Sequence, residues 1–458
     1  MLKRTSCFIA SLLLLLCLAG CENASITPSV TPKLNGIALS EYAIIYDQDD
    51  VDYNRRAAQY IQGEIQSRIG LSLPIRDDNS AESTYEIVVG ETNRDISSQL
   101  DAQTGTNFAI LADDNRIALE GEYFTIAAAA YYFVETYITD TACEAVIPKE
   151  TMVHSPIVKE AKSVIFLIGD GMGQYQSRLF DYLSVPAYAV SDGENQFYGY
   201  MLPAKGLSRT DSLSGTTDSA AGGTALSTGF KTNNGYIGKD QSHKVRQSLT
   251  DLAISMGKAT AIMSTEVQTG ATPASFSAHA DDRSHTNTIY SNQMMLKNRY
   301  GTIFSGNLKD YNNSDLEREI ATTLSAMEDS ENGFFLMYEE AHIDGACHNQ
   351  DVDQAFVALI RFNQAIGLFM EYAFYHPDTF VLITADHETG SMGLDSSGKI
   401  VCNTGVHSSS DVPVFAYGHM SECFNNKVVE NIQIPKTIAK LWGVEKFGSE
   451  NAEYPPLF

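Results

Sequence analysis

The sequence is poor in basic residues. Its 458 residues include 31 lysines and arginines against 57 aspartates and glutamates, which gives a formal net charge of −26 at pH 7. Nucleic acids and anionic membrane surfaces repel a chain of this charge, so neither is expected as a partner. Small anionic substrates stay open, because bound cations and a local arginine can reverse the field inside one site.

The sequence also lacks closely spaced cysteine pairs. None of its seven cysteines falls in the C-x-x-C spacing of structural zinc sites. A metal site in this chain therefore has to rely on aspartate, glutamate and histidine. Cys402 and Cys423 are near each other in sequence, and we expect them to form a disulfide if the protein is exported.

The N-terminus has no apolar run long enough to span a bilayer comfortably. Lys3 and Arg4 precede an apolar run from Phe8 to Leu18. A short positive region followed by such a run is typical of a secretory signal rather than of a membrane span. We therefore expect residues 1–20 to direct export and to be removed.

A motif for lipid attachment follows this run. Leu-Ala-Gly-Cys at residues 18–21 resembles the lipobox of bacterial lipoproteins, which implies that Cys21 carries lipid. An ordinary signal peptide cleaved near Cys21 is the alternative. With residues 21–33 as a tether, we expect a protein whose only membrane attachment is this lipid, on the non-cytoplasmic side of a bacterial membrane, in the periplasm or at the cell surface.

Residues 34–150 predict a small separate α/β domain. Strands are expected at residues 42–46, 85–90, 108–111 and 116–119, and helices at residues 53–69 and 124–137. This order, and Gly-Glu-Thr-Asn-Arg at residues 90–94, resembles the N-terminal accessory domain of several glycoside hydrolases. No pair of acids is placed for glycoside hydrolysis. We therefore expect a scaffold, or an accessory role in packing or ligand contact.

Beyond a link at residues 151–161, the pattern changes to long apolar strands followed by polar residues. The strands and the residues beside them are 164–168 before Asp170, 333–338 before Glu339, 380–384 before Asp386 and His387, and a strand from 412 after His407. Open α/β sheets bind ligands at the carboxyl ends of their parallel strands. We expect residues 162–458 to form a mostly parallel sheet covered by helices, with these side chains at one edge; residues 258–263 add another strand.

The spacing of the acids and histidines indicates more than one metal. Asp344 and His348 are four residues apart and would share one face of a helix, from which they can hold one ion. Glu339 cannot join that face, which indicates a different ion. Histidine with carboxylate suits Zn²⁺, and carboxylate with hydroxyl suits Mg²⁺.

Residues 217–225, Thr-Asp-Ser-Ala-Ala-Gly-Gly-Thr-Ala, predict the start of a helix built from small residues. Thr217 can cap this helix. Ser219, in the first turn, would lie in the positive field of the N-terminal amides, which favours an alkoxide or a neighbouring anion. The alternative is a helix packed tightly in a core, with Ser219 as a cap.

Together these motifs resemble the alkaline phosphatase family over residues 162–447. The matching motifs are Phe-Leu-Ile-Gly-Asp-Gly-Met-Gly at 166–173, Asp-Ser-Ala-Ala at 218–221, Ala-Thr-Pro at 271–273 with Arg283, residues 339–348, Thr-Ala-Asp-His at 384–387, and His407 with Asp-Val-Pro at 411–413. The resemblance implies that family's α/β fold, the hydrolysis of small-molecule phosphate monoesters, and two Zn²⁺ and one Mg²⁺ as cofactors. It leaves a homodimer open.

The same resemblance implies a role for each site residue. Ser219 is the nucleophile that becomes phosphorylated, and Arg283 clamps two phosphate oxygens. The implied ligand sets are Asp344, His348 and His407 for one zinc, Asp170, Asp386 and His387 with Ser219 for the other, and Asp170, Thr272 and Glu339 for Mg²⁺.

The sequence departs from the family pattern at several positions. Gly270 and Gly345 stand where family members often carry a charged or imidazole side chain near Mg²⁺ or phosphate, which leaves the third metal open. Thr216 replaces a branched aliphatic residue. His407 follows His387 by only twenty positions, without the surface domain that dimeric animal relatives insert there.

Three other functions stay open at this point. A phosphodiesterase could use the same scaffold. A sulfatase is disfavoured, because Ser219 is followed by two alanines instead of the Cys/Ser-x-Pro-x-Arg context that sulfatases need. A surface lipoprotein could also bind glycans through residues 34–150 while its phosphatase core is vestigial.

Overall fold

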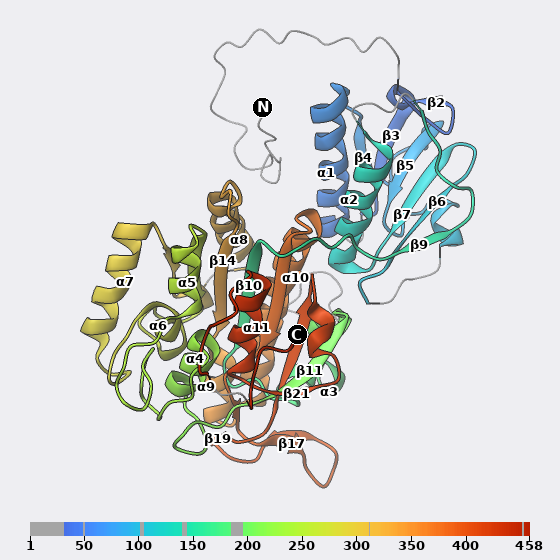
Figure 1. Cartoon of the computed structure of the whole chain (residues 1–458). Coiled ribbons are helices and arrows are strands. Elements are labelled where there is room, and N and C mark those ends of the chain that lie inside the picture. Colours follow the sequence, from blue (N-terminus) through green and yellow to red (C-terminus); the bar gives the residue numbers. More distant parts are fainter. Residues whose placement is uncertain are drawn as a thin grey trace. The chain divides into compact units, whose positions relative to one another are not determined.

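The computed structural model describes residues 32–48, 51–100, 105–139, 144–184, 196–310, 312–450 and 453–458. The predicted signal and Cys21 lie outside these residues. The chain divides into two units, one of Met1–Ile157 with Met370–His376 and one of Val158–Phe369 with Pro377–Phe458 (Figure 1). Within the described ranges, none of the helices combines the length and the apolar character that a membrane span requires.

The first unit is built on a six-stranded sheet in the order β4-β3-β5-β7-β6-β9. The sheet and its two helices comprise β3 (Tyr42–Tyr46), α1 (Val51–Ile69), β4 (Ile75–Asp77), β5 (Tyr85–Val89), β6 (Phe108–Ala112), β7 (Arg116–Glu120), α2 (Ile126–Tyr137) and β9 (Met152–His154). The pairs β3–β4, β3–β5 and β5–β7 are parallel, and β6 is antiparallel to β7 and β9. Both helices lie on the same side of the sheet (Figure 1).

The predicted strands and helices of this unit are all present. The sequence did not predict the short strands β4 and β9, nor a small sheet of β1 (Lys33–Leu34), β2 (Ile37–Ala38) and β8 (Glu144–Ala145). Strands of two or three residues are too short to show an alternating pattern.

A buried arginine holds together the loop that follows β5. The Arg94 guanidinium donates to Glu86 Oε2 at 3.0 Å and to the carbonyl oxygens of Asp78 and Ser80 at 2.8 and 3.0 Å. Arg94 and Glu86 are only 4% and 0% exposed, and Arg116 also donates to Glu86 Oε2, at 3.2 Å. Arg94 therefore ties the loop after β5 to strand β5 itself and to the loop after β4.

The second unit is built on an eight-stranded sheet in the order β13-β12-β14-β10-β15-β20-β11-β21. The strands are β10 (Ser163–Gly169), β11 (Ala204–Arg209), β12 (Ala259–Ser264), β13 (Ile303–Ser305), β14 (Phe334–Glu340), β15 (Thr379–Thr384), β20 (Val412–Tyr417) and β21 (Val428–Glu430). Neighbours from β13 to β15 are parallel, whereas β20 runs antiparallel to β15 and β11. The mostly parallel sheet is therefore confirmed.

Helices cover both faces of this sheet. Along β14, Phe335 and Met337 join a core that also contains residues of α4, α5, α6 and α11. Tyr338 lies on the opposite face and packs on Phe362 and Phe369 of α10, with ring centroids 6.3 and 5.6 Å apart. The helices are α3 (Leu179–Tyr182), α4 (Ser219–Thr228), α5 (Leu249–Ser255), α6 (Ala271–Ser277), α7 (Thr286–Tyr300), α8 (Asn313–Glu328), α9 (His342–His348), α10 (Val352–Tyr375) and α11 (Gln433–Leu441).

Two short ribbons follow β15. Strand β16 (Glu388–Thr389) pairs with β19 (His407–Ser408), and β17 (Met392–Leu394) pairs with β18 (Ile400–Cys402). The first ribbon pairs Thr389 with His407, so it brings His407 back to the strand ends.

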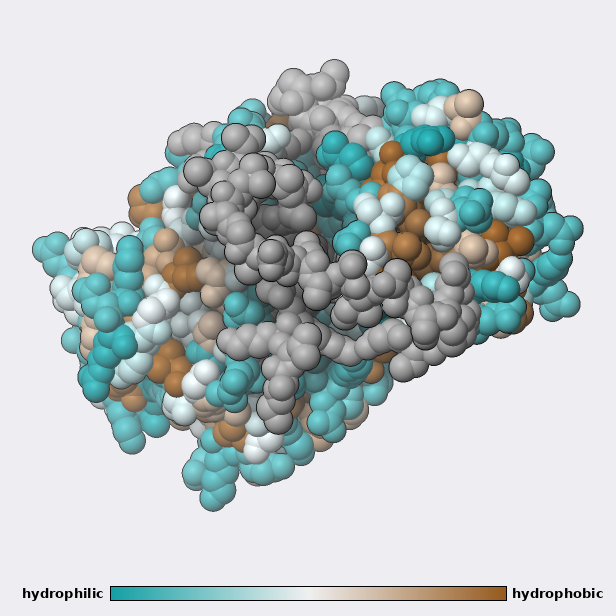
Figure 2. Space-filling view, turned by 90° about the horizontal axis from the view of Figure 1, so that it is seen from above, coloured by the Kyte–Doolittle hydropathy of each residue, from teal (hydrophilic) through white to brown (hydrophobic). Residues whose placement is uncertain are grey.

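On the face shown in Figure 2, hydrophilic residues predominate and hydrophobic residues gather in a few patches among them. Single exposed hydrophobic residues such as Val245, Tyr290 and Leu394 are common on protein surfaces and need no partner.

We predict that Arg94→Ala destabilises the first unit. The substitution leaves the buried carboxylate of Glu86 with Arg116 as its remaining arginine, so the free energy of unfolding should fall by about 3 kcal/mol. Urea unfolding followed by circular dichroism measures this loss. Fluorescence of Trp442, the one tryptophan of the chain, reports the second unit in the same samples.

The matched control is Arg55→Ala. Arg55 pairs with Asp52 at 3.3 Å on the surface, with 46% of each side chain exposed, so its loss should change the free energy of unfolding by less than about 1 kcal/mol. The account of the buried pair is wrong if Arg94→Ala shifts the unfolding transition no more than this control does.

Candidate metal centre

Acidic side chains gather at the carboxyl edge of the parallel strands in the second unit. Asp170 follows β10 directly, Glu339 lies near the end of β14, and Asp386 follows β15 by two residues. The register pairs Ile168 of β10 with both Glu339 and Thr384, so these strand ends lie side by side. The three carboxylate residues are 6%, 0% and 0% exposed. The predicted convergence at this edge is therefore present.

Helix α4 begins at Ser219. Its N-cap is Asp218, whose carboxylate accepts a hydrogen bond from the backbone N–H of Ala221 at 3.0 Å. The prediction that Thr217 caps this helix is wrong, because the Thr217 hydroxyl donates instead to the carbonyl oxygen of Asp218. Ser219 is 4% exposed, and its Oγ lies 3.2 Å from His387 Nε2.

The small residues of α4 allow it to approach its neighbours closely. A Cβ on Gly222 would lie 2.9 Å from the carbonyl oxygen of Asp386, and one on Gly223 would lie 3.0 Å from Ser275 Oγ of α6. The helix is thus packed tightly in a core, and this packing is what brings Ser219 to the strand ends. The alternative of a tightly packed helix is therefore confirmed in its packing, but its expectation that Ser219 is the cap is wrong, because Asp218 is the N-cap.

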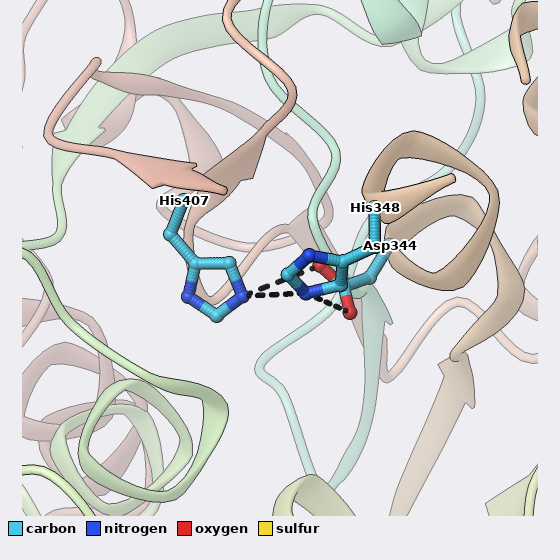
Figure 3. A group of neighbouring side chains, drawn as sticks. All are labelled: Asp344, His348 and His407. Carbon is cyan, nitrogen blue, oxygen red and sulfur yellow. Dashed lines mark hydrogen bonds and ion pairs between the residues drawn. The ribbon is translucent and has the colours of Figure 1, made fainter. Parts of the chain in front are cut away.

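The first group of ligand atoms comes from Asp344, His348 and His407 (Figure 3). His348 Nε2 lies 3.2 Å from Asp344 Oδ2, and His407 Nε2 lies 3.5 Å from Asp344 Oδ1. The two Nε2 atoms are 3.1 Å apart. As predicted, Asp344 and His348 share one face of a helix, α9.

The backbone orients both imidazoles of this group. His348 Nδ1 lies 2.8 Å from the carbonyl oxygen of Gly405, and His407 Nδ1 lies 2.9 Å from that of Thr217. An Nδ1–H that donates to a carbonyl leaves Nε2 unprotonated, which is how metal-binding histidines are usually held. The three side chains therefore present two imidazole nitrogens and a carboxylate to one point, a donor set that fits Zn²⁺.

His387 is at the centre of the second group. Its Nε2 lies 3.2 Å from Ser219 Oγ, 3.3 Å from Asp386 Oδ2 and 3.5 Å from Asp170 Oδ1. Asp170, Asp344 and His387 have ligand atoms within 4.8 Å of one another, so Asp344 borders both groups. Among the described residues, Asp170 Oδ1 and Asp386 Oδ2 are buried without a hydrogen-bond partner. Buried carboxylate oxygens in this condition fit a cation.

The pKa values show the electrostatic cost of this arrangement. Burial, and then the charges of Asp386 and Asp344, raise the pKa of Asp170 well above its ordinary value. Burial lowers the pKa of His387, which keeps its imidazole neutral and able to bind a metal. Burial also acts to raise the pKa of Asp344, but its polar contacts with His407, His387 and Thr389 outweigh burial and lower that pKa to about 2.

The third group implied by the resemblance is Glu339, Thr272 and Asp170, and the charge of Glu339 acts on Asp170. Thr272, in the first turn of α6, is fully buried and faces Glu339. Glu339 Oε2 accepts a hydrogen bond from Ser264 Oγ, whereas Oε1 is buried without a partner among the described residues. Burial, and next the charge of Glu266, raise the pKa of Glu339 well above its ordinary value. Carboxylates with a hydroxyl fit Mg²⁺, as predicted from the sequence.

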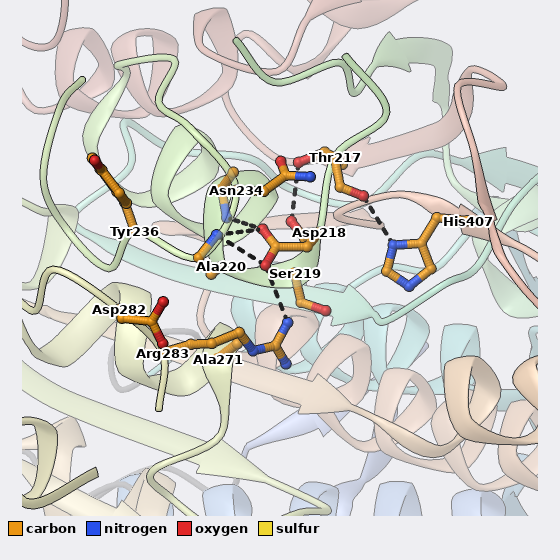
Figure 4. A network of polar contacts seen from close by, with 12 residues as sticks. Thr217, Asp218, Ser219, Ala220, Asn234, Tyr236, Ala271, Asp282, Arg283 and His407 are labelled. Carbon is orange, nitrogen blue, oxygen red and sulfur yellow. Dashed lines mark hydrogen bonds and ion pairs between the residues drawn. The ribbon is translucent and has the colours of Figure 1, made fainter. Parts of the chain in front are cut away.

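Arg283 lies beside the N-terminus of α4 (Figure 4). Its Nη1 lies 3.4 Å from Asp218 Oδ2, next to Ser219, and 44% of its side chain is exposed. The first amides of α4 and this guanidinium thus bring positively polarised groups close to Ser219. An anion bound next to Ser219 would lie close to both the helix amides and the Arg283 guanidinium.

Further residues, which the sequence patterns did not indicate, hold the ligands in place. Thr389 Oγ1 donates to Asp344 Oδ1 and lies 3.3 Å from His387 Nδ1, so it contacts both ligand groups. The Gln176 amide donates to Glu388 Oε1 at 2.9 Å beneath them. Glu388 and Thr389 follow the Asp-His motif directly, and this position after two ligands is the signal that could have identified them.

The predicted disulfide between Cys402 and Cys423 is not present. Cys347, Cys402 and Cys423 are free thiols, all buried. Cys423 lies in the core under the sheet, whereas Cys402 lies on the β18 ribbon and its thiol is hydrogen-bonded with that of Cys347. Nearness in sequence was therefore a poor guide to which thiols meet.

Comparisons with known proteins agree with this geometry. The family model "Alkaline phosphatase" matches residues 161–316 and 310–404, which is more than half of the chain. Alkaline phosphatase 3 of Bacillus subtilis is 25% identical over 348 residues, which is 64% of this chain and 74% of that protein. Alkaline phosphatase 4 of the same organism is 27% identical over 295 residues, 52% of this chain and 64% of that protein.

Solved structures lead to the same family. The alkaline phosphatase of the Antarctic bacterium TAB5 is 25% identical with a TM-score of 0.55, and the match covers 63% of this chain and all of that one. A variant of that phosphatase, solved with Mg bound in its M3 site, matches with a TM-score of 0.52. The cold-active alkaline phosphatase of Shewanella sp., 21% identical with a TM-score of 0.54 over 62% of this chain and all of that one, shares the fold. The chain therefore belongs to the alkaline phosphatase family and is a hydrolase of that superfamily.

Proposed function

We propose that this chain hydrolyses phosphate monoesters through a phosphoserine at Ser219. One observation carries the proposal: the buried Ser219 Oγ lies 3.2 Å from His387 Nε2, at the point where Asp170 and Asp386 also converge. A hydroxyl at the N-terminus of a helix, among metal-type ligands, is placed to become a nucleophile. The family match extends over this whole arrangement.

We propose Zn²⁺ for the first two ligand groups and Mg²⁺ for the third. The donor atoms fit this choice, because the first two groups contain imidazole nitrogens and the third contains oxygen alone. Within the part of the chain that the structure describes, three buried carboxylate oxygens have no hydrogen-bond partner, one each on Asp170, Asp386 and Glu339, and they support cations in these places. When bound, the cations would lower the pKa of the Ser219 hydroxyl and of the attacking water and stabilise the leaving oxygen.

The chain's own residues carry the rest of the reaction. Ser219 gives its hydroxyl proton to water as Oγ bonds to phosphorus and the ester P–O bond breaks, and the leaving alkoxide takes up a proton from water. A water oxygen then bonds to the phosphorus of the phosphoserine, the P–Oγ bond breaks, and one proton of that water restores the Ser219 hydroxyl as inorganic phosphate leaves. Arg283 offers two parallel N–H groups to phosphate oxygens on the side of Asp218, and the first amides of α4 add to the positive potential there.

A phosphodiesterase remains the nearest alternative. Phosphomonoester hydrolysis is favoured because the chain has a serine nucleophile, an arginine and a third cation group together, a combination that the family resemblance implies. These are Ser219, Arg283 and the group that contains Glu339. A glycan-binding protein with a vestigial core is disfavoured by the ligand groups in the second unit, in which the acids and histidines implied by the resemblance are brought together.

We predict that Ser219→Ala lowers turnover of a chromogenic phosphate monoester by roughly 10³-fold or more, because the nucleophile is removed. Mass spectrometry of acid-quenched wild-type enzyme should find a phosphorylated peptide that contains Ser219, and the variant should lack it. The control is Ser397→Ala, an exposed serine in the turn between β17 and β18, which should keep both activity and phosphopeptide. A phosphodiester that is turned over faster than the monoester would contradict the proposal, as would full activity in Ser219→Ala.

We also propose that the protein is exported and anchored through lipid on Cys21, with residues 34–150 as a scaffold. The proposal rests on the lipobox-like sequence at residues 18–21. Expressed in a bacterial host, the wild type should enter the detergent phase of a Triton X-114 partition and carry the mass of lipid on its N-terminal peptide. Cys21→Ser should stay in the aqueous phase. A wild-type chain without lipid at Cys21 contradicts the anchor.

A further inference from the structure

A carboxylate occupies the space above Gly270. A Cβ built on Gly270 would lie 1.6 Å from Glu266 Oε1, 2.2 Å from its Cδ and 2.8 Å from Oε2. The backbone of Gly270, with φ −58° and ψ 160°, is one that other residues adopt readily. Glycine is therefore required at position 270 because any larger side chain would overlap the carboxylate of Glu266.

Hydrogen bonds fix the loop that carries Glu266 to the third ligand group. The backbone N–H of Glu266 donates to Ser264 Oγ at 3.0 Å, and the same hydroxyl donates to Glu339 Oε2. On its other side, the carbonyl oxygen of Glu266 accepts a hydrogen bond from the N–H of Asn307 at 2.7 Å. Ser264 thus links the position of Glu266 directly to that of Glu339.

The carboxylate of Glu266 faces the third ligand group from this loop. Its charge contributes to raising the pKa of Glu339 and of Asp170. Burial raises the pKa of Glu266; Arg283 and the imidazole of His342 act to lower it, and the charges of Asp344 and Asp386 act to raise it. Among the described residues, no hydrogen bond or ion pair is found for the Glu266 carboxylate itself. A partly buried carboxylate among other acids, with no direct partner, needs positive charge beside it.

A second observation shows where that charge would be. Glu339 Oε1 and Asp170 Oδ1 are buried without hydrogen-bond partners among the described residues. Thr272, two residues after Gly270, opens its hydroxyl toward Glu339 from the same helix start. The loop at Gly270 therefore borders the third ligand group. The Glu266 carboxylate approaches this group through the space that a side chain at position 270 would fill.

We propose that Glu266 is the fourth protein group of the cation site formed by Glu339, Thr272 and Asp170, where its carboxylate accepts hydrogen bonds from water bound to the cation. Mg²⁺ usually keeps several of its waters, and carboxylates that bond those waters raise the affinity of a site. The inference rests on the proposed function, because it concerns the cation assigned there. It also explains why the chain can do without a side chain at position 270.

The test is the affinity of the zinc-loaded full-length protein for Mg²⁺, measured by calorimetry. Glu266→Ala should weaken Mg²⁺ binding by about 10–100-fold, the usual effect of removing a group that supports metal ligands. Glu331→Ala removes an exposed glutamate in the turn before β14 and should leave the affinity unchanged. Circular dichroism and zinc content, unchanged in Glu266→Ala, show that the fold and the other two ligand groups are intact.

A reciprocal exchange makes the test sharper. Gly270→Asp alone places a side chain where Glu266 stands and should weaken Mg²⁺ binding. Gly270→Asp combined with Glu266→Ala returns one carboxylate to the same space and should recover most of the affinity. The proposal is overturned if Glu266→Ala binds Mg²⁺ as tightly as the wild type, or if the combined variant is no better than Glu266→Ala.

A further measurement separates this role from an effect on Arg283. Inhibition by inorganic phosphate measures how well Arg283 binds phosphate. If Glu266→Ala alters phosphate inhibition but keeps the Mg²⁺ affinity of the wild type, the proposal is overturned. Because Mg²⁺ affinity does not depend on turnover, the inference and the proposed function can fail separately. Weaker Mg²⁺ binding in Glu266→Ala supports the inference even in a chain that turns over no monoester.

Discussion

The repulsion among buried carboxylates is the constraint on which the rest of this structure depends. Asp170, Asp386 and Glu339 are almost fully buried at one edge of the sheet, and the pKa values of Asp170 and Glu339 are raised well above the ordinary range. Packing such groups together without positive charge is strongly unfavourable. The fold can hold them there because the strands and helices around them are fixed by hydrophobic cores on both faces of the sheet, and bound cations would then remove the penalty.

Glycine and small residues make this convergence sterically possible. Gly171 has φ +73°, and a Cβ there would lie 2.8 Å from the Cα of Asp344, so the loop after β10 can contact α9 directly. Gly222 does the same for α4 and the loop of Asp386, and Gly270 makes room for Glu266. The glycines of the motifs thus allow neighbouring backbone segments and carboxylates to come into close contact. This close packing brings the ligand atoms together.

The sequence predicted the parts of this site that follow local rules. The i,i+4 pair of Asp344 and His348 follows from helical spacing, and the acids after β10 and β15 follow from strand patterns. Contacts that depend on how loops fold back were not predicted. The sequence did not show that the Glu266 side chain fills the space beside Gly270. That proximity depends on how the loop between the two residues folds back.

The errors have a similar cause. Cys402 and Cys423 are near in sequence, but Cys402 lies in the β17–β18 ribbon and Cys423 lies in the core beside the main sheet. Asp218 caps α4 in place of Thr217 because its carboxylate reaches the N–H of Ala221. The most direct test of the account is anomalous diffraction at the zinc edge from crystals of the metal-loaded protein. The account predicts two zinc peaks, one between Asp344, His348 and His407 and one between His387, Asp386 and Ser219. Peaks elsewhere, or no zinc at either place, would contradict it.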